Sequence, residues 1–442
     1  MNVILVVIDT LRAKNMSCYG YAKKTSSNID RMASEGVLFA NSFGHANNTH
    51  PTFTTIFTGV YPITHRVVRM NAQYYLNHDK IKMMTELIRG AGLTTLAVDN
   101  LATAGRFVKA AWLKRGFDVY IDYSEINKKE NRSIRRLFEI NELAFPLLEE
   151  VKSKPFFMFL HSWDTHSPYN PREQFKHMWY EGDPNGRINL GSREGRKTLE
   201  KKPTGRTTPS MKQPDPRDVE YTIAHYDATI TDADAALGDL ITKLQELGIA
   251  QDTMVILTSD HGENLGEHQI FFGHRWPYDD CIYIPMVFWC PKYIPQGKRI
   301  EAIAQQVDLA PTILELLGIE DRALFEGHSL VDVMKGRASE TYKYARMHAT
   351  YPDVRRAIRT KQYKFIKTIP GCPYEPDWPK RELYDMKSDP NEVKNIIDNA
   401  PDMAAELESE MDRWVAEELS KQPGWLDPLI EQARHGWLTY EN

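Results

Sequence analysis

Short apolar runs alternate with helix-period segments over most of the chain. The run Val3–Ile8 is continuously apolar and ends in Asp9, which is typical of a strand buried on both faces of a parallel sheet. Apolar residues recur at steps of three and four over Asp218–Leu247, and Gly248 follows as a stop signal, so a long helix is predicted there. Further strands are predicted at Thr94–Val98, Phe156–His161, Met254–Thr258 and Met286–Trp289. This alternation predicts an α/β fold with a doubly wound, mostly parallel sheet flanked by helices.

The pattern changes near residue 335. Short alternating strands are predicted at Tyr342–His348, Arg355–Arg359 and Gln362–Thr368, and a helix at Pro401–Glu418. We therefore expect a first domain over residues 1–335, and a smaller C-terminal α+β domain, an antiparallel sheet plus a helix, over residues 336–421. Residues 422–442 would form a C-terminal tail.

Two segments lie outside this regular pattern. A polar insertion at about 172–217 is rich in Lys, Arg, Gly and Pro, and it is interpreted either as a surface insertion or as a lid or subunit-contact arm. The tail contains Trp425 and Trp437, side chains that are costly to leave in water and are enriched at interfaces. It either folds back on its own chain or crosses to a second subunit, and we favour a homo-oligomer through this tail.

Composition narrows the class of protein. The 442 residues are 42% hydrophobic and 26% charged, with a net charge of −5, which is ordinary globular composition without an electrostatic case for nucleic acid binding. No stretch approaches the roughly 18 apolar residues of a membrane span. The four cysteines are scattered and form no CxxC pair, so neither a disulfide framework nor a thiolate zinc site is indicated. The N-terminal apolar run is too short for a signal segment and lacks a basic flank, so a cytoplasmic location is expected.

Metal-binding residue types stand at four candidate strand ends. They are Asp9, the pair Asp260 and His261, the pair Asp164 and His166, and His274 shortly before the Met286 strand. Ligands of open α/β sheets bind at the carboxyl ends of the strands, and carboxylate together with imidazole suits a divalent cation. A single strand-end Asp is more often a cap or turn residue. Four such ends on one face favour a metal centre.

Thr49 is the candidate nucleophile. It lies in the segment Asn47–Gly59, in which Pro51 suits the first turn of a helix. The Thr49 hydroxyl would then lie near free backbone N–H groups, where an anionic phosphoryl or sulfuryl group is favoured. A plain helix cap is the alternative role for this residue.

Taken together, the motifs resemble those of the alkaline phosphatase superfamily, on its sulfatase branch. The similar segments are Val6–Arg12 with Cys18–Gly20, Tyr226–Gly248, Leu257–Glu263, Val307–Thr312 with Gly327–Leu330, Tyr363–Phe365, Glu382–Asp385 and Asp389–Pro390. The resemblance covers nearly the whole chain. It implies the same fold and hydrolysis of phosphate or sulfate esters.

The chain departs from the sulfatase pattern at the nucleophile. Sulfatases carry Cys or Ser, then any residue, Pro, a small residue and Arg, and a maturation enzyme converts the Cys or Ser to formylglycine. Here Thr49 stands at the Cys position and Phe53 at the Arg position, and oxidation of Thr would give a ketone. The family's Gly-Lys-Trp-His lysine has no counterpart near Val98–Asn100. A plain Thr nucleophile resembles the nucleotide pyrophosphatase/phosphodiesterases and lipoteichoic acid synthases, which act on phosphodiesters.

The resemblance implies one or two divalent cations. The primary site would be Asp9, Thr49, Asp260 and His261, and a second would use Asp164, His166 and His274. Sulfatases place Lys at the His274 position and hold one cation, so imidazole there favours two, unless His274 is a neutral donor to substrate. The mixed ligand set favours zinc or manganese and leaves magnesium and calcium open.

The remaining roles are protonation of the leaving group and binding of a phosphoryl oxygen. His166 or His268 would protonate the leaving group, and Asn100 would donate to a phosphoryl oxygen. We therefore predict a metal-dependent hydrolase of small-molecule phosphate esters, phosphodiesters or phosphonate monoesters above all, that forms a phospho-threonine intermediate. The alternatives are a sulfatase or sulfamidase that works without formylglycine, a phosphoryl head-group transferase, and an inactive scaffold. The retained Asp9, Asp260 and His261 argue against the last. Loops, chiefly Arg172–Arg217 and the region of Asn100, set the natural substrate.

Overall fold

An eight-stranded sheet forms the centre of the first domain. The computed structural model describes residues 1–70, 81–101, 111–199, 213–320, 325–351, 353–372, 378–421 and 424–434. The strand order is β10-β2-β9-β6-β1-β5-β3-β4. In chain order the strands are β1 (Asn2–Ile8), β2 (Val37–Phe43), β3 (Thr94–Asp99), β4 (Val119–Asp122), β5 (Phe156–Ser162), β6 (Thr253–Thr258), β9 (Met286–Trp289) and β10 (Lys298–Gln305). Only β9 is antiparallel to its neighbours, so the expected mostly parallel sheet is confirmed.

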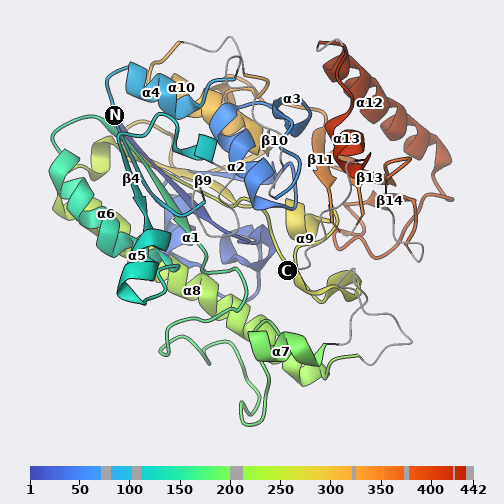
Figure 1. Ribbon diagram of the computed structural model, residues 1–442, viewed down its shortest axis with the longest axis horizontal. Coiled ribbons are helices and arrows are strands. Elements are labelled where there is room, and N and C mark those ends of the chain that lie inside the picture. The colour runs from blue at the N-terminus through green and yellow to red at the C-terminus, as the bar shows by residue number, and fades with distance from the viewer. Residues whose placement is uncertain are drawn as a thin grey trace.

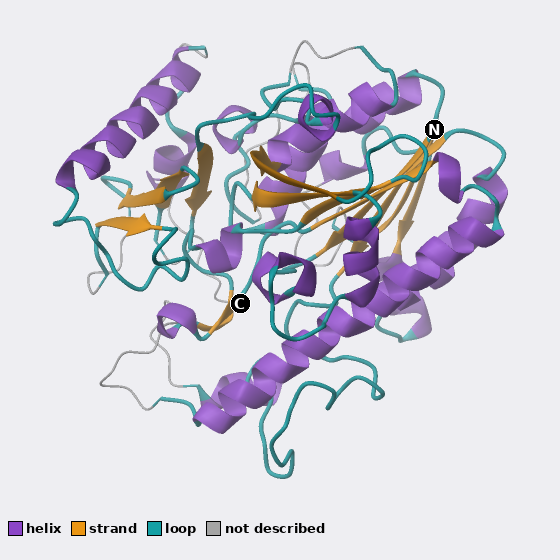
Figure 2. Ribbon diagram, turned by 180° about the vertical axis from the view of Figure 1, so that it is seen from behind, coloured by secondary structure: helices purple, strands orange, loops and turns teal. Residues whose placement is uncertain are grey.

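Helices cover both faces of this sheet (Figures 1 and 2). One face packs against α1 (Ser27–Ser34), α6 (Leu137–Val151) and α8 (Pro216–Glu246). The other packs against α2 (Thr49–Thr58), α4 (Met84–Gly90) and α10 (Leu309–Leu316). The shorter helices are α3 (Pro62–His65), α5 (Tyr123–Glu130), α7 (Arg193–Thr198), α9 (Asp279–Ile282) and α11 (Val331–Met334).

Strand β1 shows why the sequence forms this layered fold. Its side chains alternate between two cores: Val3, Leu5 and Val7 join the core beneath α2, and Ile4, Val6 and Ile8 join the core beneath α8. Successive side chains of a strand point to opposite faces, so a strand buried on both sides must be apolar throughout. All of these side chains are fully buried.

The strands that the sequence pattern missed carry polar or exposed residues. β10 is an edge strand that begins with Lys298 and Arg299, both exposed. β4 occupies the opposite edge with four partly exposed residues. β2 lies between β10 and β9, and its polar residues Asn41 and Ser42 interrupt the apolar run. The edge strands β4 and β10 need not be continuously apolar, which is why a pattern built on apolar runs does not find them.

A four-stranded antiparallel sheet with one helix forms the C-terminal domain (Figure 1). Its strands are β11 (Ala345–Ala349), β12 (Arg355–Arg359), β13 (Tyr363–Thr368) and β14 (Arg381–Asp385), and its helix is α12 (Pro401–Ser420). The predicted α+β architecture is confirmed, and β14 is an additional strand. Leu407 and Met411 of α12 pack against Phe365 and Leu383 of the sheet.

The C-terminal sheet is joined to the first domain by aromatic packing and by contacts near Thr49. The rings of Trp276 and Trp378 stack with centroids 4.6 Å apart. Asn48 Nδ2 donates a hydrogen bond of 3.2 Å to Thr350 Oγ1, in the segment that follows β11. The C-terminal domain therefore supports the start of α2.

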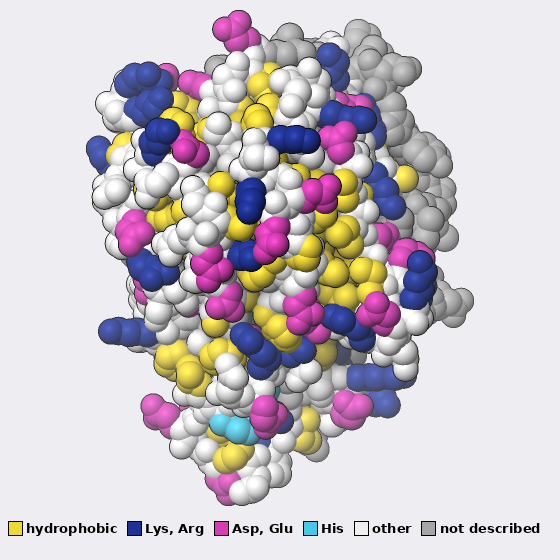
Figure 3. Space-filling view, turned by 90° about the vertical axis from the view of Figure 1, so that its left-hand side faces the viewer, with side chains coloured by type: hydrophobic (Ala, Val, Ile, Leu, Met, Phe, Trp, Pro, Cys, Tyr) yellow, Lys and Arg dark blue, Asp and Glu magenta, His cyan; other side chains and the backbone are white. Residues whose placement is uncertain are grey.

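Surface charge is mixed. Acidic and basic side chains are interspersed on the face shown in Figure 3. The four cysteines form no disulfide within the described residues. Within the described residues, no helix combines the length and apolar character needed to cross a membrane.

The described part of the tail folds back on its own chain. Helix α13 (Pro428–Arg434) places Leu429 in a small core with Val68 and Ile369. Arg356 and Asp427 form two buried hydrogen bonds of 2.6 and 2.7 Å. The folded-back alternative therefore holds for residues 424–434, whereas Trp437 lies outside the described residues.

We expect Asp427→Ala to lower the free energy of unfolding by about 3–5 kcal/mol, because it leaves the buried guanidinium of Arg356 without its partner. Chemical denaturation followed by circular dichroism would measure this. Exposed Asp402→Ala provides a carboxylate control on α12 that should change stability little. An Asp427→Ala variant as stable as that control would show that the tail is not docked through this pair.

Candidate active site

Four neighbouring parallel strands bring their carboxyl ends together at one edge of the sheet. In the order β6-β1-β5-β3, they supply Asp260 with His261, Asp9, His161 and Asp99. All five side chains are fully buried. The predicted strand-end cluster therefore has a simple structural basis, since the strands that carry it are adjacent in space.

Asp9, Asp260 and His261 form a compact group of candidate metal ligands. One ligand atom from each lies within 4.8 Å of the other two. Both carboxylate oxygens of Asp9 and Oδ2 of Asp260 have no hydrogen-bond partner there. Asp260 Oδ1 accepts from the backbone N–H groups of Thr10 and His261, at 3.1 and 2.8 Å, which fixes the orientation of the carboxylate. Three orphaned carboxylate oxygens beside an imidazole fit a divalent cation.

Electrostatics at this group support the same assignment. Burial raises the pKa of Asp9, but a contact with His161 and the charges of His166 and His261 outweigh it and lower the pKa. Burial and the negative charge of Asp9 raise the pKa of Asp260 above its usual value. Two buried carboxylates thus repel each other, and a cation between them would offset that repulsion.

Thr49 is the first residue of α2 and faces this group. Its side chain is buried, and Oγ1 lies 3.5 Å from Nε2 of His261. The N-cap position is occupied by Asn48, and its side chain makes no capping hydrogen bond. The hydroxyl of Thr49 therefore points to the candidate metal ligands, at the positive end of the helix.

His166 and His274 lie beside the first group, and a carboxylate accompanies them. Their ring centroids are 5.7 Å apart, and the ring of His274 is 4.5 Å from that of His261. Glu263 Oε2 lies 3.8 Å from His274 Nδ1. Burial raises the pKa of Glu263, but His274, His166 and Arg196 lower it below its usual value.

Asp164 has a different environment from the one its predicted role requires. Its Oδ2 accepts a hydrogen bond of 2.9 Å from the backbone N–H of Leu137, at the start of α6. Burial raises the pKa of this carboxyl to about 7. The carboxylate next to His166 and His274 is that of Glu263, and metal binding by Asp164 stays a prediction.

His161 links two carboxylates that sequence reasoning did not connect. Its Nδ1 lies 2.7 Å from Asp99 Oδ1, and its Nε2 lies 3.7 Å from Asp9 Oδ2. Burial lowers the pKa of His161, but Asp9 and Asp99 raise it to about 9. The imidazole therefore lies between the carboxylates of Asp9 and Asp99.

The two remaining predicted residues, His268 and Asn100, make their contacts outside the group of Asp9, Asp260 and His261. The ring of His268 stacks on Tyr278 with centroids 3.8 Å apart, and its Nε2 is 3.8 Å from Asp280 Oδ2. Asn100 Oδ1 accepts a 3.2 Å hydrogen bond from the indole of Trp163. No contact between described residues joins either side chain to Asp9, Asp260 or His261, and both roles stay predictions.

The residues that were missed did leave signals in the sequence. Asp99 follows an apolar strand, as Asp9 does, and the same rule selects it. His161 is a polar residue that directly follows the apolar run Phe156–Leu160. A buried polar side chain at that position needs a hydrogen-bond partner. Glu263 lies three residues after Asp260 in the same strand-end segment.

Comparison with known families gives two matches that together span most of the chain. A model of the sulfatase family matches residues 1–319, and a model of the C-terminal part of N-sulphoglucosamine sulphohydrolase matches residues 266–421. An N-acetylglucosamine-6-O-sulfatase of Bacteroides thetaiotaomicron is 34% identical over 184 residues, which are 40% of this chain and 32% of that protein. The chain thus aligns with about a third of that relative.

Solved structures share the whole fold. One was determined in complex with its substrate D-glucosamine-2-N,6-O-disulfate; it has a TM-score of 0.74 and 22% identity and covers 96% of this chain and 99% of that one. The phosphonate monoester hydrolase of Agrobacterium radiobacter has a TM-score of 0.75 and 19% identity, with 94% and 96% covered. At these identities the likeness concerns the fold.

Proposed function

Because the chain belongs to the sulfatase family of the alkaline phosphatase superfamily, we propose that it is a metal-dependent hydrolase of phosphate esters with Thr49 as nucleophile. Phosphodiesters and phosphonate monoesters are the proposed substrates. The observation that carries the proposal is the placement of the Thr49 hydroxyl, 3.5 Å from His261 and at the start of a buried helix. It faces carboxylate oxygens that lack hydrogen-bond partners among the described residues.

Asp9, Asp260, His261 and Thr49 would hold the cation. When bound, it would polarise a phosphoryl oxygen and favour the deprotonated form of the attacking hydroxyl. His261 Nδ1 lies 3.0 Å from the carbonyl oxygen of Gly262, which requires Nδ1 to carry a proton. Nε2 of the neutral ring then presents its lone pair towards Thr49 and Asp260, as a ligand must.

The chain's own residues account for the two chemical steps. Thr49 Oγ1 gives its proton to solvent water and attacks phosphorus, so that an O–P bond forms while the bond to the leaving oxygen breaks. His166, as general acid, donates a proton to that oxygen. Water then attacks the phospho-threonine from the vacated side and gives one proton to His166, while the bond from phosphorus to Thr49 Oγ1 breaks and Oγ1 takes a proton back from solvent. His166 is chosen over His268 because its ring lies beside His274.

Phosphate is favoured over sulfate by the surroundings of Thr49. The ring of Phe53, at the position of the sulfatase arginine, packs 4.7 Å from His161 and 5.8 Å from Phe159. Thr49 carries a methyl group, so its oxidation cannot give the aldehyde of formylglycine. The packed ring of Phe53 stands where the sulfatase motif has the cationic arginine. A sulfatase or sulfamidase without formylglycine and a head-group transferase are the competing proposals.

We expect kcat/KM for an aryl phosphodiester to exceed that for the matched aryl sulfate by about two powers of ten, or about 2.7 kcal/mol in transition-state free energy. Release of 4-nitrophenol from the diester, the monoester and the sulfate would measure it. Mass spectrometry of the peptide that contains Thr49 should show an unmodified residue. Preferred hydrolysis of the sulfate would favour the sulfatase alternative, and transfer to an added alcohol in place of water would favour the transferase.

A homo-oligomer through the end of the tail is part of the proposal. Residues 424–434 are committed to their own chain, so the contact would involve residues 435–442, with Trp437, Leu438 and Tyr440. Deleting residues 435–442 is expected to lower the mass measured by light scattering and to leave α13 docked. An unchanged mass would exclude this contact. A cytoplasmic location stays a prediction.

A further inference from the structure

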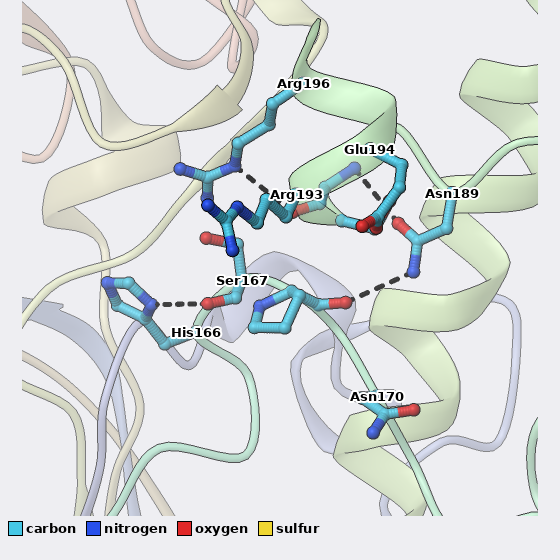
Figure 4. A pocket seen from close by; sticks show the side chains of 10 residues that line it. His166, Ser167, Asn170, Asn189, Arg193, Glu194 and Arg196 are labelled. Carbon is cyan, nitrogen blue, oxygen red and sulfur yellow. Dashed lines mark hydrogen bonds between the residues drawn. The ribbon is translucent and has the colours of Figure 1, made fainter.

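A pocket of about 530 Å³ opens beside His166, between the segment that follows β5 and the polar insertion. Residues within 166–170 form one wall, and residues within 189–196, including the start of α7, form the other (Figure 4). The side chain of Asn189 ties the walls together. Its Nδ2 donates to the carbonyl oxygens of Pro168 and Tyr169, at 3.2 and 3.1 Å, and its Oδ1 accepts from the N–H of Gly191 at 3.0 Å.

Two arginines place positive charge on the wall of this pocket. The guanidinium groups of Arg193 and Arg196 gather on one side, above Ser167, whereas Glu194 lies on the side of Asn189 (Figure 4). Arg196 Nε donates to the carbonyl oxygen of Gly191 at 3.1 Å. Among the described residues, neither arginine has a carboxylate within ion-pair distance.

The neighbouring pocket provides a contrast. It has a volume of about 150 Å³ and shares residues 166–168 and Asn170 with the first pocket. Of its two arginines, Arg135 and Arg136, the second is 3.4 Å from the carboxylate of Glu139 and is therefore paired. Two guanidinium groups held together cost electrostatic energy that an anionic ligand would recover.

The pocket borders the proposed active site at His166. His166 lines the pocket, its ring lies 5.7 Å from His274, and the ring of His274 lies 4.5 Å from His261. A substrate with its ester at Thr49 would therefore extend its remaining part past His166 towards the arginines.

We propose that this pocket is a substrate subsite for a second anionic group, so that the preferred substrates are esters that carry a carboxylate, sulfate or phosphate in addition to the ester that reacts. This inference rests on the proposed ester hydrolysis. The polar insertion would then help to determine substrate specificity. Arg193 and Arg196 are the residues that would bind the second anionic group.

The test uses two diesters that differ only in a charge on the leaving group, methyl phenyl phosphate and methyl 3-carboxyphenyl phosphate, and release of the phenol is followed by liquid chromatography. The full-length protein is compared with Arg193→Gln, Arg196→Gln and the control Lys197→Gln, an exposed cation of α7 that does not line the pocket. Arg193→Gln should raise KM for the carboxylated diester about tenfold and leave both its kcat and the hydrolysis of the diester without the carboxylate unchanged. Arg196→Gln should act in the same direction, and Lys197→Gln should have no effect. Equal losses for both diesters, or none for either, would overturn the proposal.

A binding experiment separates this inference from the reaction itself. Isothermal titration calorimetry with phenylphosphonate and 3-carboxyphenylphosphonate needs no turnover. The carboxylated ligand should bind the unmodified protein about tenfold more tightly, and Arg193→Gln should remove that difference. If the difference is present while neither diester is hydrolysed, the subsite stands and the proposed reaction fails. Inorganic phosphate should bind both proteins equally. A loss of phosphate binding in Arg193→Gln, with no preference for the carboxylated ligand, would identify a free-anion site and overturn the proposal.

Discussion

Replacing Thr49 by Ala is expected to lower kcat by at least about three powers of ten and to leave the protein folded. The covalent path loses its only attacking oxygen, and no second hydroxyl among the described residues is within hydrogen-bonding distance of His261 Nε2. The hydrogen bond of the Thr49 hydroxyl runs to the side chain of His261, so its loss should leave the backbone hydrogen bonds of α2 in place. Steady-state hydrolysis of an aryl phosphodiester would measure the loss, and circular dichroism would check the fold.

Two variants sharpen this experiment. Thr49→Ser keeps the hydroxyl and should retain partial activity. Thr58→Ala removes another buried hydroxyl of α2, one that donates 2.6 Å to the carbonyl oxygen of Thr54 at the far end of the helix. It should cost about 1 kcal/mol of stability and spare turnover. Near-normal turnover in Thr49→Ala would place the nucleophile elsewhere.

Removal of divalent metal is expected to abolish activity. The purified protein should hold one to two cations per chain, zinc or manganese, since carboxylate and imidazole are mixed in the ligand set. Elemental analysis would give the number of ions. A chelator should reduce the rate to background, and addition of zinc or manganese should restore it.

Single ligand variants should locate the ion. Asp9→Asn and Asp260→Asn should each lower metal content and activity, because each removes a charge from the buried group. Asp234→Asn is a matched control. It alters a buried carboxylate of α8 that accepts from the backbone N–H groups of Asn28 and Ile29, at 2.9 and 2.8 Å, well away from the strand ends. A chelator-resistant protein without bound metal would contradict the proposal.

The same analysis decides between two carboxylates for a second ion. If Glu263 binds the second ion together with His166 and His274, Glu263→Gln should reduce the metal content, and Asp164→Asn should leave it unchanged. The opposite pattern would favour the ligand set expected from the sequence.

Local sequence patterns determined the fold class because burial on both faces of a sheet leaves a mark on every residue of a central strand. Val3–Ile8 is apolar throughout for that reason, and the period of Asp218–Leu247 records one buried face of a helix. The positions of Asp9, Asp260 and Thr49 followed from strand ends, a helix start and family motifs. Edge strands such as β10 left no such mark, because solvent accepts their polar residues.

Tertiary structure alone decided which of these side chains meet. The order β6-β1-β5-β3 sets Asp9 between His261 and His161, although the strands occur as β1, β3, β5 and β6 along the chain. Asp164 is turned to the start of α6, and Glu263 takes the place beside His274. Arg193 and Arg196 join the pocket beside His166 only because the insertion returns to the segment after β5. Strand order and the return of a loop depend on packing between residues far apart in the chain, and that packing leaves no local pattern to read.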